Sequence, residues 1–272
     1  MALGKLGKTL RDSLSGTIKG AGDVVEATAE LTRKALTEPL KATREVAKEA
    51  TGLVQDSIAG AIQAANQTGT ELGSTVKGAV VGSIQGIGEV ATVTKDTVSD
   101  TMRATVKATK DVGGDIGKTV RSAAEGTMEA TKSVGLKAED TAYSIPRGAI
   151  QGAKEVGSDL GSVTKDAVHG TVVGVKQAGG DVMGAIRSSA SGAVKATAEV
   201  GGDVGSAARS AVEGAIDGAK EIGVSAEAAA AEAGTGALEA AGDIGESAVK
   251  SVRNVLSETV KGVKVVVKAP FK

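Results

Sequence analysis

The sequence predicts an all-α protein built from very long amphipathic helices, and three observations lead to this fold class. A 22-residue internal repeat has halves that resemble each other, so the underlying period is 11. Charged residues keep to one side of a helix drawn with that period. Large side chains are nearly absent, with one Phe, one Tyr and no Trp in 272 residues. Eleven residues in three turns give 3.67 residues per turn, which is close to a straight α-helix.

The repeat becomes visible when one glycine from each unit is aligned with the next. Residues 192–213 read GAVKATAEVGGDVGSAARSAVE, and residues 214–235 read GAIDGAKEIGVSAEAAAAEAGT. Further units begin in the same register at Gly126, Gly148, Gly170 and Gly236. Carried back to Gly16, the register divides residues 16–257 into eleven units without insertion or deletion.

The repeat divides the chain into five predicted segments. These are an N-terminal segment (1–15), a first helical arm of five units (16–125), an atypical unit (126–147), a second arm of five units (148–257) and a C-terminal tail (258–272).

The atypical unit is expected to bend the chain. It contains Glu139, Tyr143 and Pro146, and proline disfavours helix at the residue before it. We therefore expect an extended α-hairpin bent near Pro146, with arms that span roughly 165 Å at 1.5 Å per residue and that pack into a larger assembly. An unbroken or gently curved rod is the alternative, and Pro39 is a second candidate kink. A β-solenoid of 22-residue coils is a weaker one, because Ala, Lys and Glu are poor strand formers.

The apolar side of the predicted helix is unusually wide. Six of its eleven surface lines, which is more than half of the circumference, contain only Lys95, Glu139 and Glu227 as charged residues. Such segregation is typical of an amphipathic helix with a broad buried face.

The charged side is sorted into a basic edge and an acidic edge. Two copies of such a helix could lie side by side with opposite charges facing, although exposed pairs are worth only about 0.2–1 kcal/mol each. A simple solvated face is the alternative interpretation. The residues expected to pair are Lys110, Arg121, Lys154, Lys165 and Arg209 on the basic edge, and Asp111, Asp115, Glu155, Asp159, Glu199 and Asp203 on the acidic edge.

Glycine is abundant, with 39 residues, and each one inside a helix costs about 0.5–1 kcal/mol relative to Ala. Many occur as pairs four residues apart, a spacing that lets two helix backbones approach closely. We therefore expect helix packing at the pairs Gly113 and Gly117, Gly157 and Gly161, and Gly201 and Gly205, and also at Gly148 and Gly152 and at Gly214 and Gly218.

Composition argues against several classes of function. With 32 basic and 33 acidic residues the net charge is -1, so nucleic acid is not an expected partner. The chain has no Cys and a single histidine, His169, which we expect at the surface, so no catalytic, cofactor or metal site is predicted. The N-terminal residues contain no export signal, and no apolar stretch is long enough to span a membrane, which favours a cytoplasmic location.

The phrases ATKDVGGDIGKTV, GAKEVG and GAKEIG resemble the 11-residue amphipathic repeats of synucleins, perilipins and exchangeable apolipoproteins, and those of group 3 late-embryogenesis-abundant (LEA) proteins. The resemblance extends over nearly the whole chain. It implies a protein that becomes helical on lipid, on drying or with a partner. LEA proteins are strongly hydrophilic, whereas this chain has a mean hydropathy of +0.03.

The sequence therefore favours a non-enzymatic structural protein that self-associates side by side into a filament, sheet or tube. The alternatives are a peripheral protein that coats a membrane or another lipid surface, and an LEA-like protective protein. The lack of Trp and the single Phe weaken the lipid alternative, because aromatic anchors strengthen interfacial binding.

Overall fold

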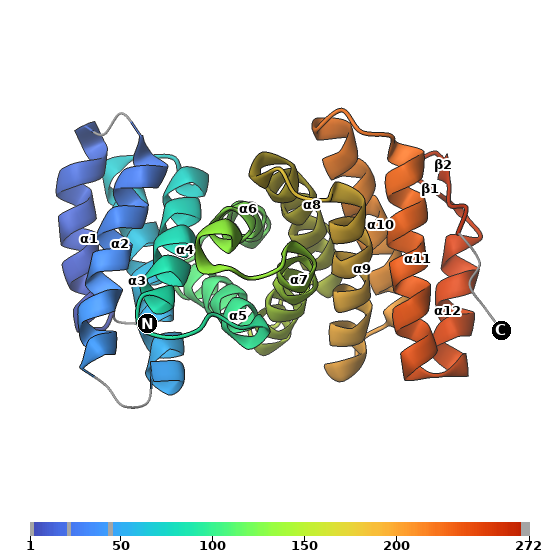
Figure 1. Cartoon of the computed structure of the whole chain (residues 1–272), viewed down its shortest axis with the longest axis horizontal. Helices are drawn as coiled ribbons and strands as arrows, with labels where there is room; N and C mark the ends of the chain where they lie inside the picture. The colour runs from blue at the N-terminus through green and yellow to red at the C-terminus, as the bar shows by residue number, and fades with distance from the viewer. Residues whose placement is uncertain (1–2, 21–22, 43–45, 268–272) are drawn as a thin grey trace.

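The computed structural model describes residues 3–20, 23–42 and 46–267. These residues form an array of α-helices with one short β-hairpin, and in Figure 1 the array runs from α1 at one end to α12 at the other. The elements are α1 (Lys5–Thr17), the 3-10 helix η1 (Ile18–Gly20), α2 (Val24–Lys41), α3 (Val46–Thr68), α4 (Leu72–Gly88), α5 (Lys95–Asp111), α6 (Ile116–Val134), α7 (Ala138–Glu155), α8 (Leu160–Ala178), α9 (Val182–Glu199), α10 (Val204–Glu221), α11 (Ala226–Ile244), α12 (Glu246–Leu256), β1 (Thr259–Val260) and β2 (Val263–Lys264).

The all-α class is confirmed, but the expectation of very long helices was wrong. From α6 to α11 each 22-residue unit supplies one helix of 18 or 19 residues and a tight turn. The segments 16–125 and 148–257 are therefore not two continuous arms, and the chain is not a two-armed hairpin.

Most turns between these helices combine a glycine that ends one helix with an acidic residue that caps the start of the next. Gly157 has a φ of 65°, in the left-handed region that glycine adopts without strain. Ser158 N then donates to Ala153 O over 2.8 Å, which is the six-residue bond of a Schellman motif. Asp159 caps α8 by accepting from Ser162 N over 2.6 Å. The phrase Val-Gly-Ser-Asp at 156–159 thus ends one helix and begins the next.

The helices form two layers, because each packs most extensively on the helix two places along the chain. The odd layer contains α1, α3, α5, α7, α9 and α11, and the even layer contains α2, α4, α6, α8, α10 and α12. Consecutive helices make smaller contacts between the layers. This arrangement is an α-solenoid, in which each repeat is stabilised by its neighbours.

Glycine brings the helices within a layer unusually close. A Cβ at Gly192 would overlap with the carbonyl oxygen of Tyr143, on the preceding helix of the odd layer. The same overlap recurs at a constant sequence separation in the six units that begin at Gly126 to Gly236, and the glycines and their carbonyl partners are Gly126 with Lys77, Gly148 with Ser99, Gly170 with Arg121, Gly192 with Tyr143, Gly214 with Lys165 and Gly236 with Arg187. The glycines that define the repeat therefore mark where two helix backbones touch.

The width of the apolar face follows from the two-layer arrangement. A helix inside the array is covered on both sides by its own layer and from below by the other layer, so only a narrow strip faces solvent. The core beneath is built mainly from Ala, Val and Ile, with buried Met and most of the buried Leu in the N-terminal cluster and Leu256 in the C-terminal one. Among the described residues the exposed large hydrophobic side chains are Ile244 and Val266.

Pro146 does not bend the molecule, contrary to the sequence-based expectation. It is buried inside α7, which continues to Glu155. The unit 126–147 begins inside α6, passes the left-handed Gly135 and ends inside α7, as expected for one step of the repeat. Pro39 also lies inside a helix, near the end of α2.

The predicted tail contains the β-hairpin, and residues 268–272 lie outside the described part. Lys261 and Gly262 both have positive φ, as a two-residue type I′ turn requires, and Thr259 pairs with Lys264. Val265 follows β2 and lies so close to Gly234 of α11 that a Cβ on that glycine would overlap with it. The hairpin and the residues after it therefore cover part of α11 that would otherwise face solvent.

We predict opposite effects for two Gly to Ala substitutions. Gly192→Ala should destabilise the protein by about 1–3 kcal/mol, because the new methyl group displaces the backbone at Tyr143. Gly52→Ala, in the open interior of α3 where a Cβ meets no atom, should stabilise it by about 0.5–1 kcal/mol. Urea unfolding followed by circular dichroism measures both, and equal effects would contradict close backbone packing at Gly192.

Candidate functional site

The outer surfaces of the two layers carry a ladder of ion pairs, each joining a helix to the next helix of its layer. The partners lie 45 to 56 residues apart in sequence. We call this set the ion-pair ladder. Its rungs are Arg33 with Glu89, Lys77 with Glu129, Lys95 with Asp140, Arg103 and Lys107 with Glu155, Arg121 with Asp166, Arg147 with Glu199, Lys165 with Asp217, Arg187 with Glu239, and Lys195 with Asp243.

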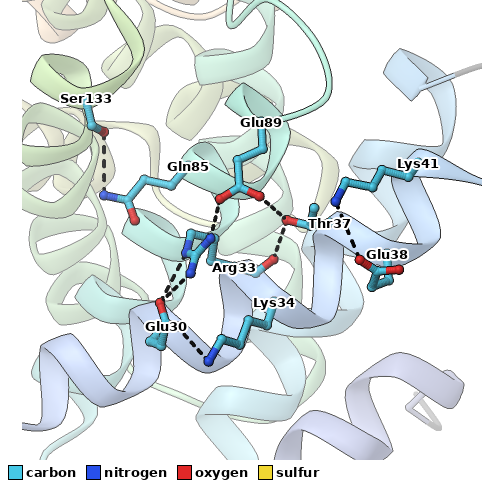
Figure 2. Close-up of polar contacts among 9 residues, drawn as sticks. All are labelled: Glu30, Arg33, Lys34, Thr37, Glu38, Lys41, Gln85, Glu89 and Ser133. Atoms are coloured by element: carbon cyan, nitrogen blue, oxygen red, sulfur yellow. Dashed lines mark hydrogen bonds and ion pairs between the residues drawn. The ribbon is translucent and has the colours of Figure 1, made fainter.

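Figure 2 shows the N-terminal rung of the even layer. Arg33 of α2 contacts Glu30 on its own helix and Glu89, which follows α4. Glu89 also accepts from Thr37 Oγ1 over 3.1 Å, and the hydrogen bond from Arg33 lowers the pKa of this carboxyl. A further hydrogen bond joins α4 to α6, because Gln85 Nε2 donates to Ser133 Oγ over 3.5 Å. One arginine thus ties two parallel helices through a single carboxylate.

The structure places the residues of the predicted basic edge as follows. Arg121 pairs with Asp166 over 2.6 Å and Lys165 with Asp217 over 3.1 Å, both within the even layer. Arg209 reaches Glu258 over 3.2 Å. Lys110 and Lys154 lie in the last turns of α5 and α7.

The residues of the predicted acidic edge divide into two groups. Glu155 and Glu199 are ladder carboxylates, and Asp111 faces Gln55 at 3.5 Å. The other three are N-caps, at the starts of α6, α8 and α10: Asp115, Asp159 and Asp203. The ladder thus brings basic and acidic edges together between repeats of one chain.

The predicted packing glycines do not act as pairs. Gly113, Gly157 and Gly201 each follow the last turn of a helix with φ between 65° and 73°, and no atom lies within 4 Å of a Cβ built on any of them. They end helices rather than pack them. Their partners Gly117, Gly161 and Gly205 lie in the first turns of α6, α8 and α10. The atom nearest to a Cβ built on Gly117 is Asp166 Oδ2, and for Gly161 it is Ser210 Oγ. For Gly205 two atoms are equally near, Asp203 Oδ1 and Val255 Cγ2. Only the second glycine of each of these three pairs therefore lies near the next helix of its layer, whereas both glycines of the pairs Gly148 and Gly152, and Gly214 and Gly218, lie against the preceding helix of theirs.

One polar cluster was missed by the sequence analysis, which expected His169 at the surface. Its side chain is only 7% exposed, and its Nε2 lies 2.6 Å from Glu221 Oε2 of α10. Glu125 of α6 lies nearby, and burial raises its pKa, assisted by the charge of Glu221 and opposed by Lys77 of α4. Lys77 Nζ also donates to Gln177 Oε1 of α8 over 2.9 Å, across the intervening α6. The even layer therefore gathers polar groups from four helices at its centre.

The sequence does contain a signal for this cluster. Residues 103, 125, 147 and 169 occupy one position of the repeat and read Arg, Glu, Arg and His, whereas their counterparts two helices later, at 155, 177, 199 and 221, read Glu, Gln, Glu and Glu. In three of these four pairs a basic or imidazole group faces a carboxylate. Glu125 and Gln177 form the exception, and there Lys77 supplies the missing cation.

The described residues offer neither a metal centre nor a membrane span. No group of three or more His, Asp or Glu side chains among them is arranged to hold a metal ion. None of the helices in this described part is both long enough and apolar enough to cross a membrane.

Comparisons with known proteins do not assign the chain to a family. No family model matches the chain, and no curated protein matches it. A similar solved structure is the crystal structure of the de novo designed helical repeat protein DHR7, at 23% sequence identity and a TM-score of 0.40, over 60% of this chain and 91% of that chain.

We predict that Glu125→Gln makes the protein more stable at pH 7. The raised pKa means that ionising Glu125 is less favourable in the folded chain than in the unfolded chain. The wild type should therefore lose stability as the pH rises above the ordinary glutamate value of 4.5, and the advantage of the variant should vanish below about pH 4.

Urea unfolding at a series of pH values measures this difference. Glu129→Gln is the matched control, because it removes the more exposed carboxylate that also pairs with Lys77 and should change stability by no more than about 0.5 kcal/mol. A Glu125→Gln variant that is less stable than the wild type at pH 7 would contradict the prediction.

Proposed function

We propose that this chain is a non-enzymatic repeat scaffold that folds as a single chain and acts through its ionic outer surface on a protein partner. The observation that carries the proposal is that the apolar faces of its helices are buried against other helices of the same chain. The sequence predicts that amphipathic helices associate side by side between copies of the chain. Here helices from neighbouring repeats of one chain associate in this way instead. Self-assembly into a filament remains a prediction without an apolar surface to support it among the described residues.

Both ends of the array support a closed, non-polymerising unit. At the C-terminal end the β-hairpin, together with Val265, lies over α11. At the N-terminal end the exposed positions of α1 are polar or glycine, among them Lys5, Lys8 and Asp12. Solenoids need such polar terminal repeats to stay apart.

The charges also favour a closed array. Each rung of the ladder places its base on the earlier helix and its acid on or just after the later one, and Arg147, which also reaches Asp96 of the earlier α5, forms a pair of the opposite direction. α11 contains four acidic residues and no basic residue, so it accepts bonds from α9 and offers no base to a following helix.

The surface that remains suits a protein partner better than nucleic acid or lipid. Its charges alternate in sign along the ladder and sum to -1 over the chain, and this balance does not favour binding along a phosphate backbone. A lipid surface would need the apolar faces, which are available only if the helices separate. Long, curved surfaces of solenoids are commonly used for protein recognition, and alternating charge gives such a contact its register.

Light scattering after gel filtration, combined with circular dichroism, tests the proposal in lipid-free buffer. We expect a helical monomer of 26.7 kDa across a wide concentration range, and no change in helicity when anionic vesicles are added. Gly192→Ala is the positive control, because loosened packing should expose apolar faces and increase vesicle binding. Filaments of the wild type would support the self-assembly hypothesis instead, and helicity that appears only with vesicles would support the lipid hypothesis.

A further inference from the structure

One side of α12, the last helix of the even layer in the described part of the chain, is not covered by another helix. In Figure 1 α12 lies at the end of the array, and among the described helices it packs on α10 and α11. Ser251 and Val255 of α12 lie against Gly205 of α10. Because successive residues of an α-helix are rotated by about 100°, Val249 and Arg253 lie on the opposite side of α12.

An open groove of about 390 Å³ runs along this opposite side. Gly242 at the end of α11 lines it, together with Val249, Lys250 and Arg253 of α12, and Glu246 is the one acid in the lining. Lys250 and Arg253 are exposed, and neither has an ion-pair partner among the described residues. The groove therefore combines an apolar side chain with two unpaired bases.

Arg253 continues a row of bases that recurs every 44 residues in the even layer. Every earlier member of the row contacts a carboxylate on or just after the next helix of that layer, and the pairs are Arg33 with Glu89, Lys77 with Glu129, Arg121 with Asp166, Lys165 with Asp217, and Arg209 with Glu258. Val249 likewise continues the row of Gly117, Gly161 and Gly205, which lie near the next helix. The uncovered side of α12 thus has the register of a surface on which another helix packs.

A second copy of the chain does not fit this surface. Four even-layer helices place a glycine against the backbone of the preceding helix at one position of the repeat, and these glycines are Gly82, Gly126, Gly170 and Gly214. The same position in α2 is Glu38, whose side chain is 82% exposed. If α2 of another copy packed on α12 in this register, Glu38 would lie where the two backbones touch. The charge and the register therefore favour a helix from a different protein.

We infer that the uncovered side of α12 binds an amphipathic helix of a partner protein. This helix would take the place of a further even-layer helix, with Gly or Ala where it meets Val249 and with Asp or Glu opposite Lys250 and Arg253. Small residues permit a close approach, and the ion pairs set the register of the contact. The inference rests on the proposed scaffold function, because it names the chemistry of the partner and the place where it binds.

A peptide of residues 202–223, which contains α10, is a probe with this chemistry. In the folded chain Gly214 of α10 lies against the backbone of α8, and Asp217 pairs with Lys165 over 3.1 Å. Lys165 is the equivalent of Arg253 in the row of bases. The peptide therefore offers α12 the same face that α10 offers α8.

Titration of the full-length ¹⁵N-labelled chain with this peptide tests the inference by NMR. The backbone amides of residues 246–254 should shift, because they form the uncovered side of α12. We expect a Kd of about 0.1–1 mM, since the isolated peptide has to become helical when it binds.

Charge reversal tests whether the two bases direct the contact. Arg253→Glu, at an exposed position, should leave the fold intact and weaken binding about fivefold or more, because repulsion replaces attraction. A peptide with Asp217→Lys should bind the Arg253→Glu chain more tightly than it binds the wild type. Lys8→Glu is the matched control, since it reverses an exposed base on α1 and should leave binding unchanged.

Two results would overturn the inference. One is the absence of amide shifts in residues 246–254 at a peptide concentration of about 5 mM, well above the expected Kd. The other is binding of equal strength to the wild type and to Arg253→Glu, which would mean that the peptide binds elsewhere. Light scattering on the same samples separates these results from the scaffold proposal. A folded monomer that does not bind the peptide contradicts only this inference, whereas filaments contradict the scaffold proposal.

Discussion

The fold depends on the close approach of helix backbones that glycine permits. With almost no aromatic side chains, the helices cannot fill wide gaps between one another, and at about 25 cal/mol per Å² small side chains bury usefully only when the helices lie close together. A glycine in each unit from Gly126 to Gly236 removes the side chain at the point of closest contact. The energetic cost of glycine in a helix is thereby offset by packing along the whole array.

Close spacing also explains the ionic surface. When two parallel helices nearly touch, long side chains at their outer edges can reach each other without extending into solvent, as Arg147 and Glu199 do. The bond from Lys77 to Gln177 goes further, since it crosses α6 to join helices that are not adjacent. Neighbouring helix axes ordinarily lie about 8–10 Å apart, so a bond across two steps requires compact packing in this layer. The individual rungs are exposed and add little stability, so they serve mainly to set which helices pair and in which register.

Sequence reasoning predicted the helical class, the 22-residue unit, the broad apolar face and the opposed charge edges. It did not predict the turns that end each helix and begin the next. Gly113, Gly157 and Gly201 follow Val and precede an aspartate by two residues, which is a helix stop followed by a helix start. A period of 3.67 residues per turn is nevertheless compatible with a continuous helix, and the glycine pairs four apart were assigned to packing. Periodicity alone cannot distinguish one long helix from many short helices that share a register, because both place charges in the same rows. The polar cluster at His169 was missed for a related reason, since its partners come from helices that sequence spacing alone does not bring together.

Small-angle X-ray scattering in lipid-free buffer tests the central claim most directly, because the two architectures differ greatly in size. A two-layer array of 272 residues should have a radius of gyration of about 20 to 25 Å, slightly above that of a compact domain of this length. Two continuous arms, each about 165 Å long, would give a radius of gyration of about 50 Å. A radius in the compact range is the result predicted here, and one as large as that of the extended arms would contradict the glycine-terminated repeat array.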